Sequence, residues 1–139
     1  MKALVLGKTG FIGQNLFNRL KKEGYDVVGC SRSTGVDILD YSQIRDFIQQ
    51  ESPNIIFNLA CHVGSMLYVR EFAADVISDN LQMSLNLYKA IVECDRDIKI
   101  VHPLANCAYP GDSTIQHEED WLNGDVHKFA QRHKRLHEF

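Results

Sequence analysis

Three glycines near the amino terminus have the spacing of a phosphate-binding turn. They lie in the segment Gly7-Lys8-Thr9-Gly10-Phe11-Ile12-Gly13, directly after a short apolar run. Gly7 permits a tight turn, Gly10 allows the backbone to approach a pyrophosphate, and Gly13 allows the next helix to pack closely. Free N–H groups at the start of that helix would point toward the phosphates. The spacing therefore predicts a dinucleotide-binding turn.

The dipeptide Lys8-Thr9 after Gly7 also invites comparison with the phosphate loop of NTPases. That loop requires a further glycine five residues before Gly7, where this chain has Lys2. The residues between them form an apolar run typical of a strand, so the NTPase interpretation is excluded.

A second group of polar residues, Ser31 and Arg32, follows the next apolar run. In a dinucleotide-binding fold this position meets the adenosine ribose. An acidic residue there favours the 2′-hydroxyl of NAD, whereas an arginine accommodates the 2′-phosphate of NADP. Arg32, helped by Ser31, therefore favours NADP over NAD.

Strands and helices, which the sequence predicts to alternate along the chain, must position these residues. Short apolar runs predict strands, and apolar residues at helical spacing predict helices between them. Asp40 is the expected N-cap of the second helix, with Gln43 as its capping-box partner and Pro53 beyond its end. The expected strands are 3–6, 26–31, 54–59 and 98–101, and the expected helices are 10–23, 41–52 and about 75–94.

The third helix carries an apolar stripe. Ile77, Leu81, Leu85, Tyr88 and Val92 recur at helical spacing on one face. This spacing is typical of an amphipathic helix.

This order predicts an α/β, Rossmann-type doubly wound parallel sheet with helices on both faces. We expect the fold to be truncated after the fourth strand, because no further strand pattern follows Pro103. Residues 1–126 are the expected NAD(P)-binding domain. Residues 127–139 are interpreted as a basic, His-rich divergent tail, with four of the 15 Lys and Arg and three of the six His.

Composition narrows the classes of function. The chain has 139 residues and a formal net charge of −3, so no global basic field predicts binding to nucleic acid or to an anionic membrane. No apolar run approaches the length of a membrane span or a signal-peptide core.

The four cysteines form no CxxC pair, and the histidines have no metal-ligand spacing, so we expect no metal site. His62 and His102 are interpreted as polar residues at strand ends. Reduced thiols in the cytoplasm are the expectation.

Several segments resemble the extended short-chain dehydrogenase/reductase family, which comprises NAD(P)-dependent nucleotide-sugar epimerases, dehydratases and reductases. Within it, the resemblance is to the GDP-L-fucose synthase subfamily, over residues 1 to about 126. The segments that carry it are 7–13, 37–40, 58–64 with Asn80 in the third helix, 106–110, 118–119 and 122–124.

The resemblance implies roles for individual residues around the cofactor. The pyrophosphate would be held by Gly7, Thr9, Gly10, Phe11, Ile12 and Gly13. Ser31 and Arg32 would hold the 2′-phosphate, and Asp37 and Ile38 would meet the adenine. Leu59, Ala60 and Cys61 would line the path to the nicotinamide ribose, and Asn80 would lie near the active site. A plain helix-surface amide is the alternative for Asn80. The long helix resembles one that family members use for dimer packing, which makes a homodimer an expectation.

The family's catalytic residues are not found here. Members use a Tyr-x-x-x-Lys pair and a Ser or Thr, in which the tyrosine is the acid/base. None of the five tyrosines is followed four residues later by lysine, and Ala105 stands where the serine should precede Tyr109. Cys107 matches a subfamily cysteine that exchanges protons during epimerisation, although a small buried apolar residue is the alternative.

Three interpretations of function therefore remain. The chain is the cofactor-binding part of a nucleotide-sugar epimerase/reductase, a dinucleotide-binding module without catalysis, or a fragment that needs a partner chain. The first would take a nucleotide sugar as substrate.

Overall fold

The computed structural model describes residues 1–105, 109–110, 115–121 and 123–124. The chain divides into two compact units, Met1–His102 and the residues from Pro103 onward. The described part of the second unit contains a single 3-10 turn, Glu118–Asp120. The predicted tail, 127–139, lies outside the described residues.

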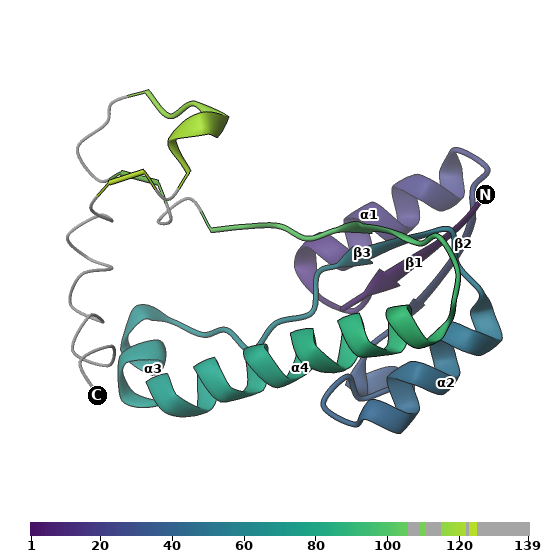
Figure 1. Ribbon diagram of the computed structural model, residues 1–139, viewed down its shortest axis with the longest axis horizontal. Helices are drawn as coiled ribbons and strands as arrows, with labels where there is room; N and C mark the ends of the chain where they lie inside the picture. Colours follow the sequence, from purple (N-terminus) through teal and green to yellow (C-terminus); the bar gives the residue numbers. More distant parts are fainter. Residues whose placement is uncertain (106–108, 111–114, 122, 125–139) are drawn as a thin grey trace. The chain divides into compact units, whose positions relative to one another are not determined.

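The first unit is built on a four-stranded sheet in the order β2-β1-β3-β4 (Figure 1). The strands are β1 (Lys2–Leu6), β2 (Asp26–Cys30), β3 (Ile55–Asn58) and β4 (Lys99–Val101). All three pairings are parallel. The predicted Rossmann-type fold is confirmed, because β1 sits inside a parallel sheet whose order reverses direction at that strand.

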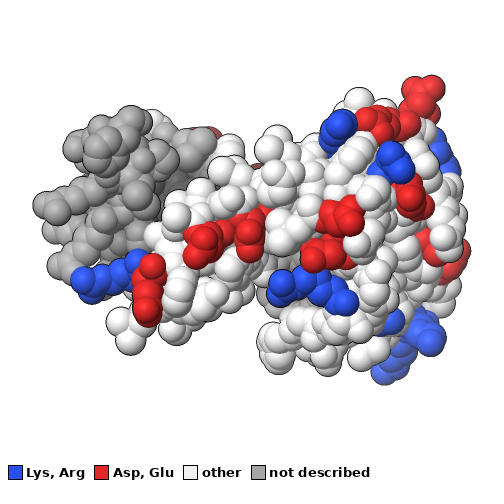
Figure 2. Space-filling view, turned by 90° about the horizontal axis from the view of Figure 1, so that it is seen from below, with Lys and Arg blue, Asp and Glu red and all other residues white. Residues whose placement is uncertain are grey.

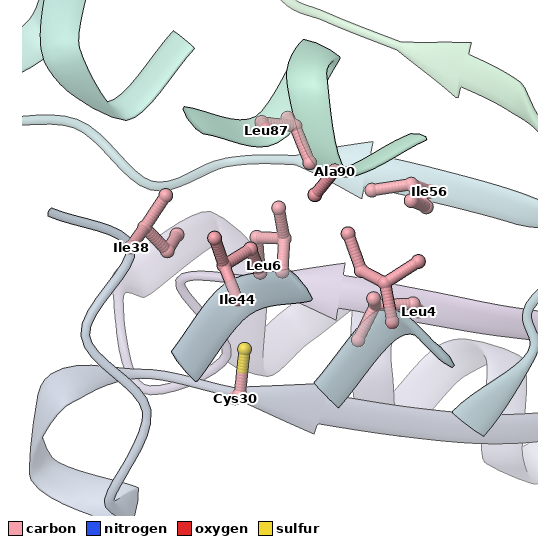
Figure 3. Packing of buried hydrophobic residues seen from close by; sticks show 9 residues of the cluster. Leu4, Leu6, Cys30, Ile38, Ile44, Ile56, Leu87 and Ala90 are labelled. Carbon is pink, nitrogen blue, oxygen red and sulfur yellow. The ribbon is translucent and has the colours of Figure 1, made fainter. Parts of the chain in front are cut away.

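Helices cover both faces of this sheet. Figure 1 shows α1 (Phe11–Lys22) on one face, and α2 (Tyr41–Glu51) and α4 (Ala73–Glu93) on the other. Strand β1 is the central element and its apolar residues are buried on both sides, as a parallel sheet under two helical layers requires. Buried side chains from β1, β2, β3, α2, α4 and the loop after β2 form one cluster, seen in Figure 3, which comprises Leu4, Leu6, Cys30, Ile38, Ile44, Ile48, Ile56, Leu87 and Ala90.

The second helix begins where the sequence predicted. The carboxylate of Asp40 accepts hydrogen bonds from the backbone N–H groups of Ser42 and Gln43. The predicted capping box is not reciprocal, however. The Gln43 amide donates to the Asp40 carboxylate and accepts from the Asp37 N–H, so it supports the turn before the helix instead of the Asp40 backbone.

The third predicted helix differs in two ways. A separate short helix, α3 (Met66–Glu71), precedes it, and α4 starts at Ala73. The apolar stripe is largely exposed, with Leu81 60% and Leu85 64% accessible. A second face of α4, which includes Leu87 and Ala90, packs against the core. The predicted stripe therefore lies on a solvent-facing side of α4, and α2 packs against the other face.

Among the described residues, no helix is both long enough and apolar enough to cross a membrane.

Candidate functional site

Three neighbouring strands, β2, β1 and β3, end in register at their carboxyl ends. Leu6, the last residue of β1, is paired with Cys30 of β2 and with Asn58 of β3. Gly7, Ser31 and Leu59 therefore emerge side by side at one edge of the sheet. A crevice at this edge, where the strand order reverses, is the usual ligand site of doubly wound folds.

A cleft of about 430 Å³ lies at this edge. Residues from the glycine turn, from the end of β2 and the loop after it, from the end of β3 and from α4 contribute to its wall. They are Gly7, Thr9, Gly10, Ser31, Arg32, Ser33, Val36, Asp37, Ile38, Leu39, Leu59, Ala60, Cys61, His62, Asp79 and Met83.

The glycine turn is shaped by close backbone contacts. Gly7 has φ +77°, and a Cβ there would lie 2.8 Å from the Leu59 carbonyl carbon. A Cβ on Gly13 would lie 2.1 Å from the Gly7 carbonyl oxygen, so only glycine lets α1 start so near the turn. Gly10 is the N-cap of α1 and has no side-chain cap. The N–H groups of the first helical turn have no acceptor within the helix itself, so they are available to a ligand.

The predicted pyrophosphate residues separate into two groups. Gly7, Thr9 and Gly10 line the cleft. Phe11, Ile12 and Gly13 form the first turn of α1 and do not line it, and the Phe11 side chain is 87% exposed. These three residues would therefore meet a ligand through their backbone N–H groups.

A hydroxyl-rich turn follows β2. The Ser31 hydroxyl lies 3.0 Å from that of Ser33, which in turn donates to the Thr9 hydroxyl at 3.3 Å. This link joins the turn after β2 to the glycine turn. Arg32 lines the same end of the cleft, and within the described part of the chain no carboxylate pairs with its guanidinium.

Asp37 and Ile38, in the loop after β2, also line the cleft and are less exposed than Arg32. The Asp37 carboxylate accepts from the Leu39 N–H, and the Ile38 side chain is buried in the core. The buried Asn86 amide of α4 donates to the carbonyl oxygens of both Ile38 and Leu39, at 2.9 Å each. Sequence reasoning missed Asn86, because an asparagine at a core position of a helix carries no signal of its distant partner.

The residues after β3 are held by α4. The Asn80 side chain accepts from the His62 N–H and donates to the His62 carbonyl, both at 2.8 Å. Asn80 does not line the cleft, although Asp79 before it does. Leu59, Ala60 and Cys61 line the cleft together with His62, for which the sequence predicts only a polar residue at a strand end.

The cysteines differ in environment. Burial raises the pKa of the Cys30 thiol to about 12, with a smaller opposing influence from Lys8. Cys61 is exposed and lines the cleft. Cys107, the predicted proton-exchanging residue, lies outside the described residues. Over the ranges that the structure describes, no group of three His, Cys, Asp or Glu is placed to hold a metal ion.

Comparison with known proteins gives a consistent result. The model of the NAD dependent epimerase/dehydratase family matches residues 3–131. GDP-L-colitose synthase of Yersinia pseudotuberculosis is 28% identical over 123 residues, which are 88% of this chain and 39% of that protein. GDP-L-fucose synthase of Sinorhizobium fredii is 26% identical, over 76% of this chain and 33% of that protein.

Solved structures resemble the fold in the same way. The GDP-mannoheptose C4 reductase MlghC of Campylobacter jejuni, solved with NADP bound, superposes with a TM-score of 0.78 at 24% identity, over 93% of this chain and 41% of that one. A GDP-L-fucose synthetase of Naegleria fowleri bound to NADP superposes with a TM-score of 0.74 at 23% identity, over 97% and 41%. The chain thus spans 33% to 41% of the length of these relatives.

Proposed function

The chain belongs to the NAD dependent epimerase/dehydratase family, and from that premise we propose that it forms the NADP-binding part of a GDP-sugar epimerase/reductase. The observation that carries the proposal is the cleft at the aligned strand ends. There the uncapped start of α1 and the glycine turn lie beside the hydroxyls and guanidinium that follow β2.

The residues present fit a dinucleotide. Gly7 and Gly10 present no side chain to the cleft where a diphosphate would lie, and the N–H groups of the first turn of α1 supply donors and a positive dipole end. Val36, Leu39 and Met83 line the cleft and offer apolar surface for an adenine ring, beside Asp37 and the backbone of the buried Ile38. When bound, the nicotinamide ring would supply or accept a hydride. The chain's own residues bind and orient it.

The preference for NADP is carried by Arg32, with Ser31 and Ser33. A guanidinium and two hydroxyls suit a phosphate dianion, and no acidic residue stands at the end of β2 to bind a free 2′-hydroxyl. The NADP-bound relatives support this choice.

The test is a titration of the purified chain with NADPH and with NADH. The wild-type chain should prefer NADPH. Arg32→Ala should weaken NADPH binding about tenfold or more, since it removes charged hydrogen bonds, and change NADH binding less than about twofold. Arg45→Ala, on α2 and paired with Asp46, is the matched control and should change neither. Equal losses for both cofactors on Arg32→Ala would reject the assigned role.

Catalysis is a separate question, because the sequence contains no Tyr-x-x-x-Lys pair. We therefore expect this polypeptide to bind the cofactor without turnover, either as a binding module or as a part that needs a partner chain. Cys107 remains the proposed proton-exchanging residue. Oxidation of NADPH by the purified chain with a GDP-4-keto-6-deoxy sugar would overturn the expectation.

The proposed setting is the cytoplasm, supported by the free thiols of Cys30, Cys61 and Cys94. The proposed partner is a second copy of the chain, docked on the exposed stripe of α4. Ile77, Leu81, Leu85, Tyr88 and Val92 repeat every three or four residues, which suits a self-complementary helix seam. We call these five residues the α4 apolar face.

A further inference from the structure

The loop after β2 is held by an asparagine from a distant helix. Asn86 of α4 is 5% exposed, and its Nδ2 donates to the carbonyl oxygens of Ile38 and Leu39. A carbonyl oxygen can only accept, so the nitrogen of the amide must face the loop. The Asn86 Oδ1 accepts from the Gln82 Nε2 at 2.7 Å, one turn earlier on α4. The buried amide is therefore fixed in one orientation from both of its ends.

The loop itself contains neither helix nor strand over residues 36–40. Two side-chain bonds shape it locally. The Asp37 N–H donates to the Gln43 side chain, and the Asp37 carboxylate accepts from the Leu39 N–H. The bond to Gln43 joins the loop to α2, whereas the bonds from Asn86 join it to α4.

The two segments that Asn86 joins both line the cleft. Val36 and Leu39 contribute apolar side chains from the loop, and Met83 contributes one from α4. Met83 precedes Asn86 by three residues, so the two lie on neighbouring positions of the helix surface. Because Asn86 ties the loop to α4, it sets the spacing between the apolar side chains that an adenine ring would contact.

We propose that Asn86 is a positioning residue that preorganises the adenine end of the cleft, so that a dinucleotide binds without first having to order the loop. The inference rests on the proposed function, because it requires that the cleft binds a dinucleotide. Asn86 does not itself line the cleft, so it acts through Ile38 and Leu39. A loop that held the binding conformation for only about a tenth of the time would weaken the apparent affinity about tenfold, with every ligand contact unchanged.

The experiment is isothermal titration of the full chain at pH 8 with NADPH and with adenosine 2′,5′-bisphosphate, which contains the adenine end alone. Asn86→Asp keeps the shape of the side chain but places carboxylate oxygens against two carbonyl oxygens in a buried site. The Kd of both ligands should rise by the same factor, about tenfold. Asn18→Asp makes the same substitution at an exposed position of α1 and should change neither Kd.

Hydrogen–deuterium exchange separates positioning from a general loss of stability. Peptides that cover residues 36–40 should exchange faster in ligand-free Asn86→Asp than in the ligand-free wild type, because the loop has lost its bonds to α4. Saturating NADPH should return their exchange to the wild-type rate, since the ligand then orders the loop. A merely structural role would lower the melting temperature and leave the Kd of the folded variant unchanged.

A second variant keeps the proposal testable if Asn86→Asp does not fold. Gln82 is exposed and lies outside the cleft, so Gln82→Glu should fold. A glutamate carboxylate cannot donate to the Asn86 Oδ1, so the amide loses the bond that orients it. The Kd for NADPH should then rise about threefold, as expected for the loss of one neutral hydrogen bond that acts indirectly. Asn18→Asp again controls for the added charge.

Unchanged Kd values in folded Asn86→Asp, or in Gln82→Glu where that variant decides, would overturn the positioning role and leave the proposed function intact. A loss confined to NADPH, or a loop that exchanges at the wild-type rate in ligand-free Asn86→Asp, would overturn it as well. If the wild-type chain melts cooperatively but binds neither ligand, the proposed function is rejected and this inference with it.

Discussion

Gly10 and Gly13 perform different tasks in the same turn. A Cβ on Gly13 would enter the space of the Gly7 carbonyl, at 2.1 Å, and neither partner is a flexible side chain that could move aside. A Cβ on Gly10 would meet only the Gly7 oxygen, at 3.3 Å, and would otherwise project where the ligand is expected. Gly13 therefore allows α1 to pack against the turn, and Gly10 allows a ligand to reach the backbone.

We predict that Gly13→Ala destabilises the chain by about 1–3 kcal/mol, the usual cost of an overpacked site. Gly10→Ala should change stability less and weaken NADPH binding more. Urea unfolding and cofactor titration of both variants measure the two effects. The same unfolding midpoint in Gly13→Ala and in the wild type would contradict the packing role.

The thiols provide a second prediction at this scale. With a pKa raised to about 12 by burial, Cys30 holds almost no thiolate near neutral pH, and it is also inaccessible. Iodoacetamide should therefore label Cys61 and spare Cys30 in the native chain, as read by peptide mass spectrometry. NADPH should slow labelling at Cys61, which lines the cleft. Equal labelling of Cys61 with and without saturating NADPH would place the cofactor elsewhere.

At the scale of the element, α2 depends on its cap. Hydrogen bonds from the side chains and backbones of Ser42 and Gln43 lower the pKa of the Asp40 carboxyl to about 2, from a usual value of 3.8. A carboxyl whose pKa is lower in the folded state stabilises the fold above the unfolded-state pKa, and this contribution is lost as the pH falls through the folded-state value. The relevant window is therefore between about pH 4 and pH 2.

We predict that Asp40→Ala lowers the melting temperature by a few degrees at pH 7, because α2 loses its N-cap. The difference from the wild-type chain should shrink as the pH falls from 4 toward 2, where the carboxylate is lost in both proteins. Melts followed by circular dichroism across this range test it. Asp46→Ala, on the exposed side of α2, is the control, and a similar loss there would argue against a specific cap.

Helix α4 shows how one element can serve two surfaces. Leu87 and Ala90 belong to the core, whereas the α4 apolar face is turned to solvent, with Val92 79% exposed. Asn86 lies on the buried side and bonds the loop that lines the cleft. The same helix therefore positions the candidate site and offers an apolar surface to a partner.

At the scale of the whole molecule, charge does not concentrate on the side that bears α2 and α4. In the view of Figure 2, acidic and basic side chains of the described residues are interspersed, with uncharged surface between them. An apolar seam in such a surface suits association with another protein copy better than attraction to a polyanion.

We predict that the purified chain self-associates through the α4 apolar face. Leu85→Glu or Leu81→Glu should shift the sedimentation profile toward monomer, because burying an unpaired carboxylate in the seam is unfavourable. Leu67→Glu, at a leucine of α3 that is 75% exposed, is the control and should leave the profile unchanged. A wild-type chain that is monomeric at all concentrations would contradict the prediction that it associates through the α4 apolar face.

Much of the fold was predictable because its signals are local. The apolar run at 3–6 predicts a strand buried on both faces, and the glycine spacing predicts the turn after it. Asp40 predicts the start of α2, since a cap needs only residues one turn away. With right-handed crossovers, this order of elements leads to the observed parallel sheet and brings Gly7, Ser31 and Leu59 to one edge.

Only the tertiary structure decided which distant side chains meet. The bonds of Asn86 to the loop after β2, and of Asn80 and Asp79 to His62, join residues 17 to 48 positions apart. Periodicity likewise shows that Ile77, Leu81 and Leu85 share a face, but not what lies opposite it. A sequence pattern fixes how residues are arranged within one element, whereas the choice of neighbour depends on how elements pack. The glycine turn is therefore encoded locally, whereas the contacts of His62 with Asp79 and Asn80 arise from packing.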